Sequence, residues 1–571
     1  MANFDDILRH LGEFGRYQKW VYFLLCLPAI PHGVRMMINV YLLNVPDHRC
    51  AIPGYNNDTY AVQSKYHAEL INKTIPFVER NGKLQYDQCH LYFSSPGSSN
   101  RTIIGCNRWV YDKSVFQSTA ATELNMVCRN DIQPSNAQMI FMGGYFAGAF
   151  IFGALGDRFG RRKALFLSIV ILFAGGLALN WANSYALFVV FRFINGASTA
   201  GMFTTCFVIG MEFVGPSKRV WAGIISGFFF TSGYLFLTGV AFFIRDWHTL
   251  ELVMATPVAV FLIYWWIIPE SPRWLLNVFR LEEAEMIIRH AARVNKVTIP
   301  DSALQFEKED MDAKLKMPKT SIFQLFTHRT LLFRTIVLFY SWMAVSLAYF
   351  GLSSNTDNLG AGSLHLNSML ACLVEYPANI ICLLLLNRIG RKALLCAFMT
   401  LGGAACILSV ITILYVDDAN QWSTVTLSMI GKLCVAGGFG VVYVYSTEIF
   451  PTVVRSSALG LSSSFARIGG MLAPYFIDLG KEVEGKWGRA LPLLMFGVLC
   501  VMAGLLDLTL PETLNRDLPE TIEDARNFSR KSPAGYSRLK NDEKTGQNHA
   551  MQAGLSSPPK DGDVSSRTVP F

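Results

Sequence analysis

The sequence is dominated by long apolar stretches that contain no Asp, Glu, Lys or Arg, such as 132–156, 220–244 and 393–416. Each is long enough to cross a lipid bilayer, which takes about 20 apolar residues. Only 16% of the 571 residues are charged, whereas a soluble chain carries about 25%. These features predict a membrane protein and argue against a soluble enzyme, a disordered chain and a small disulfide-rich protein.

Twelve predominantly apolar stretches, some of which contain one or a few charged residues, follow one another along the chain. Inside a bilayer the backbone must satisfy its own hydrogen bonds, so each stretch is expected to be a helix. The predicted fold is therefore an all-α membrane protein with twelve transmembrane helices. The predicted spans are 17–43, 135–156, 164–183, 185–212, 221–244, 250–269, 331–353, 364–387, 393–416, 423–447, 457–479 and 489–510.

Basic residues gather in the short connections 156–163 and 387–392, and at Lys218 and Arg219. Lys and Arg mark cytosolic loops, so both termini are predicted to be cytosolic. These scattered loops also account for most of the net charge of +8. Because no single basic patch forms, we expect no nucleic-acid partner. No cleavable signal peptide is evident before residue 19.

The order of spans and loops predicts five regions. A cytosolic N-terminus precedes an N-terminal half of six helices, and a cytosolic linker with short helices separates it from a C-terminal half of six more. A cytosolic and largely disordered tail, rich in Ser, Gly, Asp and Lys, ends the chain. The regions are 1–16, 17–269, 270–329, 330–511 and 512–571.

The long connection 44–134 is predicted to lie outside the cell. It contains three N-glycosylation sequons and four cysteines. Four cysteines in an oxidising compartment suggest two disulfides, for which three pairings are possible. The predicted glycosylation sites are Asn57, Asn72 and Asn100, and the cysteines are Cys50, Cys89, Cys106 and Cys128.

Charged motifs after the second, fourth and sixth span recur in the second half at offsets of 230 to 242 residues. Duplicated halves with substrate bound between them are typical of secondary transporters. Paired charges at the cytosolic ends could latch the halves together, although setting the topology is the simpler role. The predicted latch residues are Asp157, Arg158, Arg161, Arg162, Glu212, Arg219, Glu270, Arg273, Arg388, Arg391, Glu448, Arg455 and Glu512.

These motifs resemble those of known transporters. Residues 153–162 are similar to the loop signature of the major facilitator superfamily, which implies two pseudo-symmetric six-helix halves. More specifically, the chain resembles solute carrier family 22, the organic cation, carnitine and organic anion transporters, and within it the invertebrate organic cation transporters. The segments that carry this resemblance are 12–18, 46–50, 269–276, 349–360, 448–455 and 510–513.

The resemblance implies a multi-pass plasma-membrane transporter, secondary active or facilitative, that moves small organic cations and zwitterions by rocker-switch alternating access. An organic anion exchanger and a substrate-sensing membrane receptor are the alternatives. No enzyme motif is found, so we expect neither catalysis nor a cofactor. Coupling to Na⁺ or H⁺ and the oligomeric state stay open.

Aromatic rings are the expected contacts for an organic cation, because the ring face attracts positive charge. Helix packing is an equally simple explanation for any single ring. Phe203, Phe207, Trp342 and Tyr349 rank first because the resemblance implies cavity positions for them. The aromatic candidates are Phe203, Phe207, Phe230, Tyr234, Trp342, Tyr349, Phe350 and Tyr443.

Charges inside the spans are costly and therefore informative. Glu375 is predicted to be a cation or proton site, or a tie to a neighbouring helix. Arg467 is predicted to bind a substrate carboxylate, because the resemblance implies Asp here in strict cation transporters and Arg in carnitine and anion transporters; packing is its alternative role. Snorkelling explains Arg35, and structural roles are expected for Arg192 and Lys432.

Overall fold

The structure is a computed structural model of the chain. It describes residues 4–80, 83–94, 101–215, 218–300, 322–359, 362–416, 421–483, 485–516, 518–519 and 521–528. Asn100, most of the tail and the middle of the predicted linker lie outside the described residues, and the predictions made for them stay predictions.

Helices occupy all twelve predicted spans. Within the described part of the chain, eleven helical segments are long and apolar enough to cross a membrane. The remaining predicted span, the eleventh, is the 27-residue helix α22, whose Ser, Gly and charged residues lower its mean hydropathy. The helices are α2 (Arg16–Cys26), α3 (Ala29–Met37), α4 (Asn39–Leu42), α7 (Gln133–Phe159), α8 (Arg161–Leu179), α9 (Tyr185–Phe213), α10 (Arg219–Phe243), α11 (Trp247–Ala255), η3 (Thr256–Ile263), α12 (Tyr264–Ile267), α17 (Arg329–Ser354), α18 (Leu364–Leu373), α19 (Glu375–Ile389), α20 (Arg391–Tyr415), α21 (Trp422–Ile449), α22 (Arg455–Lys481) and α23 (Lys486–Asp507).

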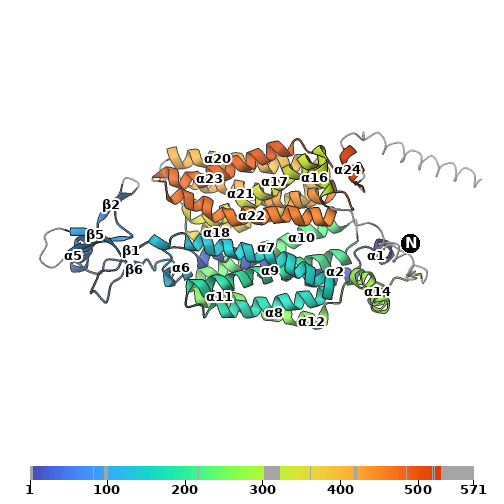
Figure 1. Ribbon diagram of the computed structural model, residues 1–571, viewed down its shortest axis with the longest axis horizontal. Helices are drawn as coiled ribbons and strands as arrows, with labels where there is room; N and C mark the ends of the chain where they lie inside the picture. The colour runs from blue at the N-terminus through green and yellow to red at the C-terminus, as the bar shows by residue number, and fades with distance from the viewer. Residues whose placement is uncertain are drawn as a thin grey trace, which may run out of the picture.

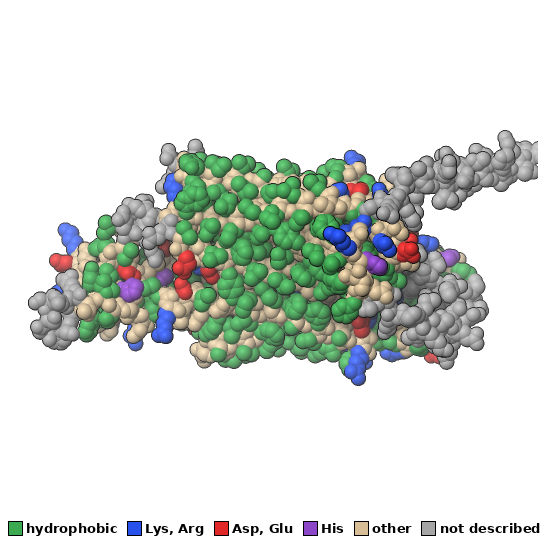
Figure 2. Space-filling model, turned by 45° about the horizontal axis from the view of Figure 1, so that its top comes forward, with side chains coloured by type: hydrophobic (Ala, Val, Ile, Leu, Met, Phe, Trp, Pro, Cys, Tyr) green, Lys and Arg blue, Asp and Glu red, His purple; other side chains and the backbone are tan. Residues whose placement is uncertain are grey.

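The helices form two bundles that lie side by side (Figure 1). One contains α7 to α12, and the other contains α17 and α20 to α23. The bundles meet where α7 packs on α22 and where α10 packs on α18 and α19. On the face shown in Figure 2, apolar side chains form a broad band across the middle, and charged side chains gather at both ends. Such a band is what a bilayer requires of the surface that faces it.

Three spans are interrupted. The first breaks between α2 and α3, where Pro28 lies, and the sixth passes through the 3-10 helix η3 between α11 and α12. The eighth breaks at Val374 between α18 and α19. Pro377 lacks an N–H for the carbonyl four residues earlier, so the eighth helix cannot continue regularly there. Glu375 therefore stands at the start of a new helix inside the span.

The segment between the first two spans forms a small strand-containing region at one end of the molecule, opposite the N-terminus and α24 (Ile522–Asn527) (Figure 1). Three antiparallel strand pairs and two short helices build it. They are β1 (His48–Cys50) with β6 (Trp109–Tyr111), β2 (Phe77–Arg80) with β3 (Lys83–Tyr86), β4 (His90–Ser94) with β5 (Arg101–Gly105), α5 (Lys65–Thr74) and α6 (Ala120–Glu123).

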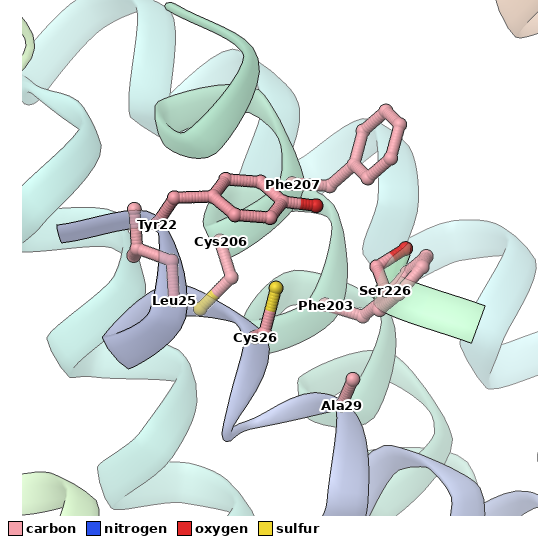
Figure 3. A pocket seen from close by; sticks show the side chains of 8 residues that line it. All are labelled: Tyr22, Leu25, Cys26, Ala29, Phe203, Cys206, Phe207 and Ser226. Atoms are coloured by element: carbon pink, nitrogen blue, oxygen red, sulfur yellow. The ribbon is translucent and has the colours of Figure 1, made fainter. Parts of the chain in front are cut away.

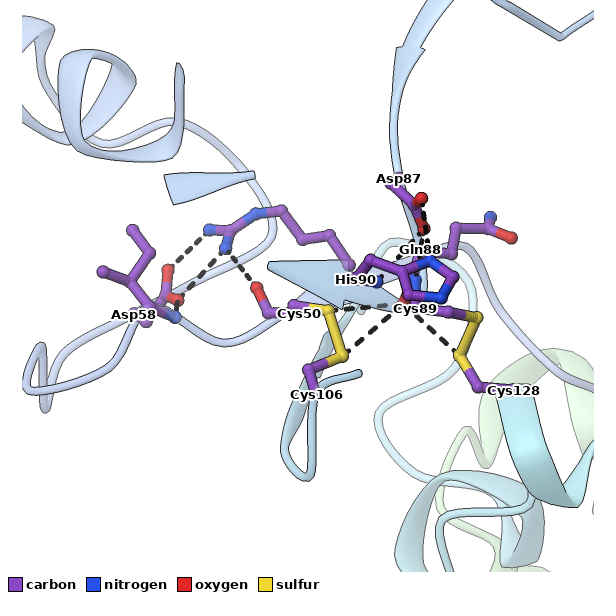
Figure 4. The surroundings of a disulfide bond; sticks show 10 residues. Cys50, Asp58, Asp87, Gln88, Cys89, His90, Cys106 and Cys128 are labelled. Atoms are coloured by element: carbon purple, nitrogen blue, oxygen red, sulfur yellow. Dashed lines mark hydrogen bonds and ion pairs between the residues drawn. A yellow bond between two sulfur atoms is a disulfide. The ribbon is translucent and has the colours of Figure 1, made fainter. Parts of the chain in front are cut away.

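Two disulfides hold this region, and they join Cys50 to Cys106 and Cys89 to Cys128 (Figure 4). The structure thereby selects one of the three pairings that the sequence left open. The sequon residues Asn57 and Asn72 are both exposed, as an acceptor for a glycan must be.

A buried ion pair stabilises the same region. Arg49 donates to Asp58 at 2.5 and 3.1 Å, and His67 contacts the same carboxylate at 2.9 Å. Burial alone would raise the pKa of Asp58, but the hydrogen bonds from Arg49 and its neighbours hold that pKa below its usual value. The carboxylate is therefore ionised, which suits its pairing with a guanidinium.

Short helices lie at the opposite end, in the region predicted to be cytosolic. Asn295, at the end of α14, accepts from the Tyr17 amide at 2.9 Å and donates to the Leu11 carbonyl at 3.0 Å. This side chain ties α14 to the start of the first span. The short helices are α1 (Phe4–His10), α13 (Pro272–Asn277), α14 (Leu281–Asn295), α16 (Gln324–Thr327) and α24.

Candidate functional site

A row of aromatic rings crosses from one half to the other near the centre of the bundle. Phe203 stacks on Phe207 with ring centroids 6.1 Å apart, and Phe207 lies 6.3 Å from Tyr443 of the C-terminal half. Tyr443 meets Trp342 edge-on at 4.7 Å. Four predicted aromatic residues from both halves are thus brought into one continuous surface.

Phe203 and Phe207, the residues of this row that belong to the N-terminal half, line a small cavity (Figure 3). Figure 3 shows Phe203 and Phe207 on one side of it, with Tyr22 and two cysteines facing them. The cysteines and Tyr22 were not predicted, because neither residue type is rare in apolar helices. The lining residues are Tyr22, Leu25, Cys26, Ala29, Phe203, Cys206, Phe207 and Ser226.

Glu375 is the centre of a buried polar cluster in the C-terminal half. Its carboxylate accepts from the Tyr349 hydroxyl at 2.6 Å and forms an ion pair with the Lys432 ammonium at 3.1 Å. The same ammonium stands 3.2 Å from the Tyr349 ring centroid and donates to Ser353 at 2.6 Å. The negative charge predicted to attract a cation is therefore already paired with an internal one.

This cluster also reaches the other half. The Thr231 hydroxyl on α10 donates to the second Glu375 oxygen at 3.0 Å. Next to it, Ser232 and Tyr376 hydroxyls lie 2.9 Å apart. The interruption of the eighth helix thus places polar groups where the two halves touch.

Arg467 has a different environment. Its guanidinium stands 4.3 Å from the ring centroid of Tyr145 on α7, so it too contacts the opposite half. The side chain is partly exposed, and within the described part of the chain no carboxylate forms an ion pair with it. A cation without a protein partner can accept an anionic group from elsewhere.

His32 on α3 also contacts Tyr145, although it was not among the residues predicted from the sequence. Its ring stacks on Phe203 at 4.2 Å, and its Nε2 lies 3.2 Å from the Tyr145 hydroxyl. Phe230, one of the predicted aromatic residues, lies 5.3 Å from the same ring. The described residues therefore connect the aromatic row to Arg467 through His32 and Tyr145.

The remaining aromatic predictions, Tyr234 and Phe350, lie in the same hydrophobic core as Trp342 and Tyr349. Tyr234 is fully buried among its neighbours. Phe350 packs edge-on against Tyr349 at 5.3 Å and is buried as well. Both stand in the main hydrophobic core, so packing accounts for them and a substrate role stays a prediction.

The N-terminal half buries a second charge cluster, and one prediction made for it is wrong. Arg35 does not reach the membrane surface, since it is only 2% exposed and donates to Glu251 on α11. Arg192 donates to Asn39 and stands 4.5 Å from the Phe141 ring centroid. The structural role predicted for Arg192 fits this position.

At the predicted cytosolic end, the first latch motif folds around a glycine. Gly160 links α7 to α8 with a φ of 110°, a backbone conformation that suits glycine. The Glu270 carboxylate accepts from the Arg161 and Arg162 amides at 3.0 and 3.2 Å and so caps α8. The Arg161 side chain pairs with Asp157 at 2.9 Å and lies 3.6 Å from Glu212.

The C-terminal half repeats this geometry. Gly390 has a φ of 108°, and the Glu512 carboxylate accepts from the Arg391 and Lys392 amides at 2.9 and 3.1 Å. The Arg391 side chain pairs with Glu448 at 3.0 Å. A carboxylate at a helix N-terminus satisfies free amides and complements the helix dipole. Each of these ion pairs joins residues of a single half, so a latch between the halves stays a prediction.

The other latch candidates lie close by. Arg219 and Arg455 each donate to a backbone carbonyl five residues earlier at 3.2 Å. Arg158 and Arg162 stand over the rings of Phe159 and Trp265, and Arg388 is exposed. Arg273 is the second residue of α13.

Polar contacts close the opposite end, where the strand-containing region lies. Ser135 on α7 donates to Asp478 on α22, and Tyr475 donates to Asn136 at 2.6 Å. On the other side of the junction, His365 lies 3.2 Å from the Ala241 carbonyl. The halves are thus held together at their predicted extracellular ends. Among the described residues, no group of three or more His, Cys, Asp or Glu could hold a metal ion.

Comparison with known proteins identifies this arrangement. The sequence profile of the sugar (and other) transporter family matches residues 98–524. An organic cation transporter protein of Drosophila melanogaster is 40% identical over 92% of this chain and 95% of its own length. Mouse solute carrier family 22 member 4 and human organic cation/carnitine transporter 2 are each 33% identical over 92% of this chain and 94% of their own length.

The fold is also similar to that of a solved transporter structure. The xylose transporter XylE from E. coli, in a partially occluded inward open conformation, matches 88% of this chain and all of its own length with a TM-score of 0.60 at 15% identity. The predicted major facilitator fold is confirmed. The protein is a multi-pass membrane transporter and not an enzyme, and the chain belongs to the sugar (and other) transporter family and, within it, to solute carrier family 22.

Proposed function

We propose that the protein is a plasma-membrane transporter, secondary active or facilitative, of small organic cations and zwitterions. It moves them by alternating access as the two six-helix halves rock around a central site. The names of the relatives support the substrate class. The membrane potential favours the entry of a cation by about 2.3 kcal/mol per charge per 100 mV. It does not drive a zwitterion that carries no net charge, so coupling to Na⁺ or H⁺ stays open for that substrate.

The observation that carries the proposal is the pairing of charges at the centre. Glu375 is neutralised by Lys432, whereas Arg467 has no ion-pair partner in the described part of the chain. The aromatic row from Phe203 to Trp342 offers faces to an ammonium group. A zwitterion suits this arrangement best, with its carboxylate on Arg467 and its ammonium against the rings.

The same observation favours one alternative, an organic anion exchanger. Arg467 would attract a simple anion, and the paired Glu375 would not repel it. The two functions differ in the need for the ammonium group, so they predict different substrates.

The cytosolic motifs fit the movement. Glu270 and Glu512 hold the ends of their own halves together, which lets each half move as a unit. Asp157, Arg158 and Arg388 are exposed at these ends, and they are available to the opposite half when the cytosolic ends meet. We propose that they form the latch in that state.

Radiolabelled uptake in cells that express the protein tests the function. Carnitine, tetraethylammonium and an aromatic carboxylate are compared with and without sodium. We expect saturable uptake of the first two, with carnitine preferred. Preference for the aromatic carboxylate would contradict the proposal and support the anion exchanger.

The variant Arg467→Asp sharpens the same test. It should shift the preference from carnitine towards tetraethylammonium, because the central charge changes sign. The control is Lys486→Asp, which makes the same change of charge at an exposed position at the start of α23. An unchanged ratio of the two uptake rates in Arg467→Asp would assign Arg467 a packing role.

A further inference from the structure

His32 combines deep burial with an unused hydrogen-bonding atom. The side chain is 4% exposed, and its Nδ1 has no hydrogen-bond partner among the described residues. A buried polar atom without a partner is costly and rare in folded proteins. A ligand that binds beside the aromatic row would supply the hydrogen bond that Nδ1 lacks.

The neighbours of His32 fix which nitrogen carries the hydrogen. The Tyr145 hydroxyl has His32 Nε2 as its only hydrogen-bond acceptor in the described part of the chain, at 3.2 Å. Arg467, which covers the Tyr145 ring, is a pure donor. The hydroxyl therefore donates to Nε2, and the neutral imidazole carries its hydrogen on Nδ1.

The arrangement offers two kinds of donor to one ligand. Arg467 supplies a guanidinium, and His32 supplies a neutral N–H held in place by its stack on Phe203. Both residues contact Tyr145, so the two donors belong to one neighbourhood. A carboxylate suits such a pair of donors, because it has two oxygens and no hydrogen to donate in return. An ammonium group accepts a hydrogen bond from neither, because it has no acceptor atom.

We propose that His32 is a specificity-determining residue that donates from Nδ1 to the carboxylate of a zwitterionic substrate, beside Arg467. This inference rests on the proposed function and adds a second anchor to it. The aromatic row then receives the ammonium end. A substrate without a carboxylate gains nothing from His32.

Three substitutions separate the roles of the imidazole. His32→Asn places an amide donor where Nδ1 stands, and His32→Gln places an amide where Nε2 stands. His32→Phe keeps the stacked ring and removes both nitrogens. Uptake of carnitine, of its deoxy analogue γ-butyrobetaine and of tetraethylammonium is measured for each variant and for the wild type, at equal surface expression.

The ratio of carnitine to tetraethylammonium uptake should fall about tenfold in His32→Phe and His32→Gln, as expected for a lost hydrogen bond to a charged group. It should stay within about threefold of the wild-type ratio in His32→Asn, since a donor remains at the Nδ1 position. γ-Butyrobetaine should follow carnitine, because it keeps the carboxylate.

Each other outcome overturns the inference. An equal fall in all three variants, or no fall in any, leaves His32 with a packing role. A fall for carnitine alone assigns Nδ1 to the hydroxyl group and not to the carboxylate. If the wild type takes up neither zwitterion, the proposed function fails together with the inference; if it takes up both and the variants do not differ, only the inference fails.

Discussion

Each half of the transporter buries one cation at a matching place and neutralises it in its own way. Arg192 and Lys432 are 240 residues apart, within the offsets of the repeated motifs. Arg192 interacts electrostatically with Glu251 and Arg35, which belong to the same half. Lys432 pairs with Glu375, which also accepts from the opposite half. One cluster is sealed inside its half, and the other spans the junction.

This difference separates two functions of buried charge. The cluster of the N-terminal half fixes helices that never part, so it serves as a scaffold. The cluster of the C-terminal half includes a contact that must break when the halves separate. Only the second cluster can respond to the conformational state of the transporter.

The largest expected effect comes from Lys432→Met. The substitution leaves the Glu375 carboxylate buried without a counter-charge, which costs about 3–5 kcal/mol. The midpoint of thermal unfolding of the detergent-solubilised protein should fall clearly. The double variant Lys432→Met with Glu375→Gln should recover most of the loss, because no unpaired charge remains. Equal midpoints for the single variant and the wild type would mean that the pair is not formed.

Glu251→Gln tests the sealed cluster. Two guanidinium groups share one carboxylate there, so its loss leaves both cations unneutralised and should cost about 3 kcal/mol or more. Arg35→Met should cost less, because Arg192 remains as a counter-charge.

Thermal unfolding compares the stability of these two variants, and the relative uptake of carnitine and tetraethylammonium should not change in either. A changed substrate ratio would show that this cluster is not sealed from the central site.

Thr231→Val should have the smallest effect, and it acts on the junction itself. The variant loses one hydrogen bond between the halves, worth about 1 kcal/mol, which is about a fivefold shift between states. A membrane-impermeant thiol reagent should label a cysteine placed at Met139 faster, because Met139 contacts Tyr475 at the outer contact between the halves, which opens more often in the variant. Thr238→Val is the matched control, since the Thr238 hydroxyl donates to a carbonyl of its own helix. Equal acceleration in both variants would contradict a role for the junction.

The sequence predicted the membrane helices well, because the length and apolar character of a stretch are local properties. The ninth helix, α20, spans Arg391–Tyr415 against a prediction of 393–416. The interruption beside Pro377 was not predicted, although the proline was a visible signal. The pairing of the four cysteines could not be read from their spacing, because it depends on how the strands of the loop fold.

The candidate site was only partly predictable. The aromatic row and Arg467 followed from residue type and family resemblance. The pairing of Glu375 with Lys432 did not, since the two residues stand on different helices and only the packing brings them together. Glu251 was missed although it lies inside a predicted span, where its charge was a signal. His32 was missed because a histidine in an apolar stretch is by itself a weak signal.

The caps at Gly160 and Gly390 have a consequence for how the chain is made. Glu270 and Glu512 follow the helix starts that they cap by 109 and 121 residues. During synthesis, the first amides of α8 and α20 have no carboxylate until the last helix of the same half has left the ribosome. The final residues of each half therefore supply the cap of a helix made much earlier. A nascent chain that ends before them leaves the first amides of that helix without their carboxylate partner.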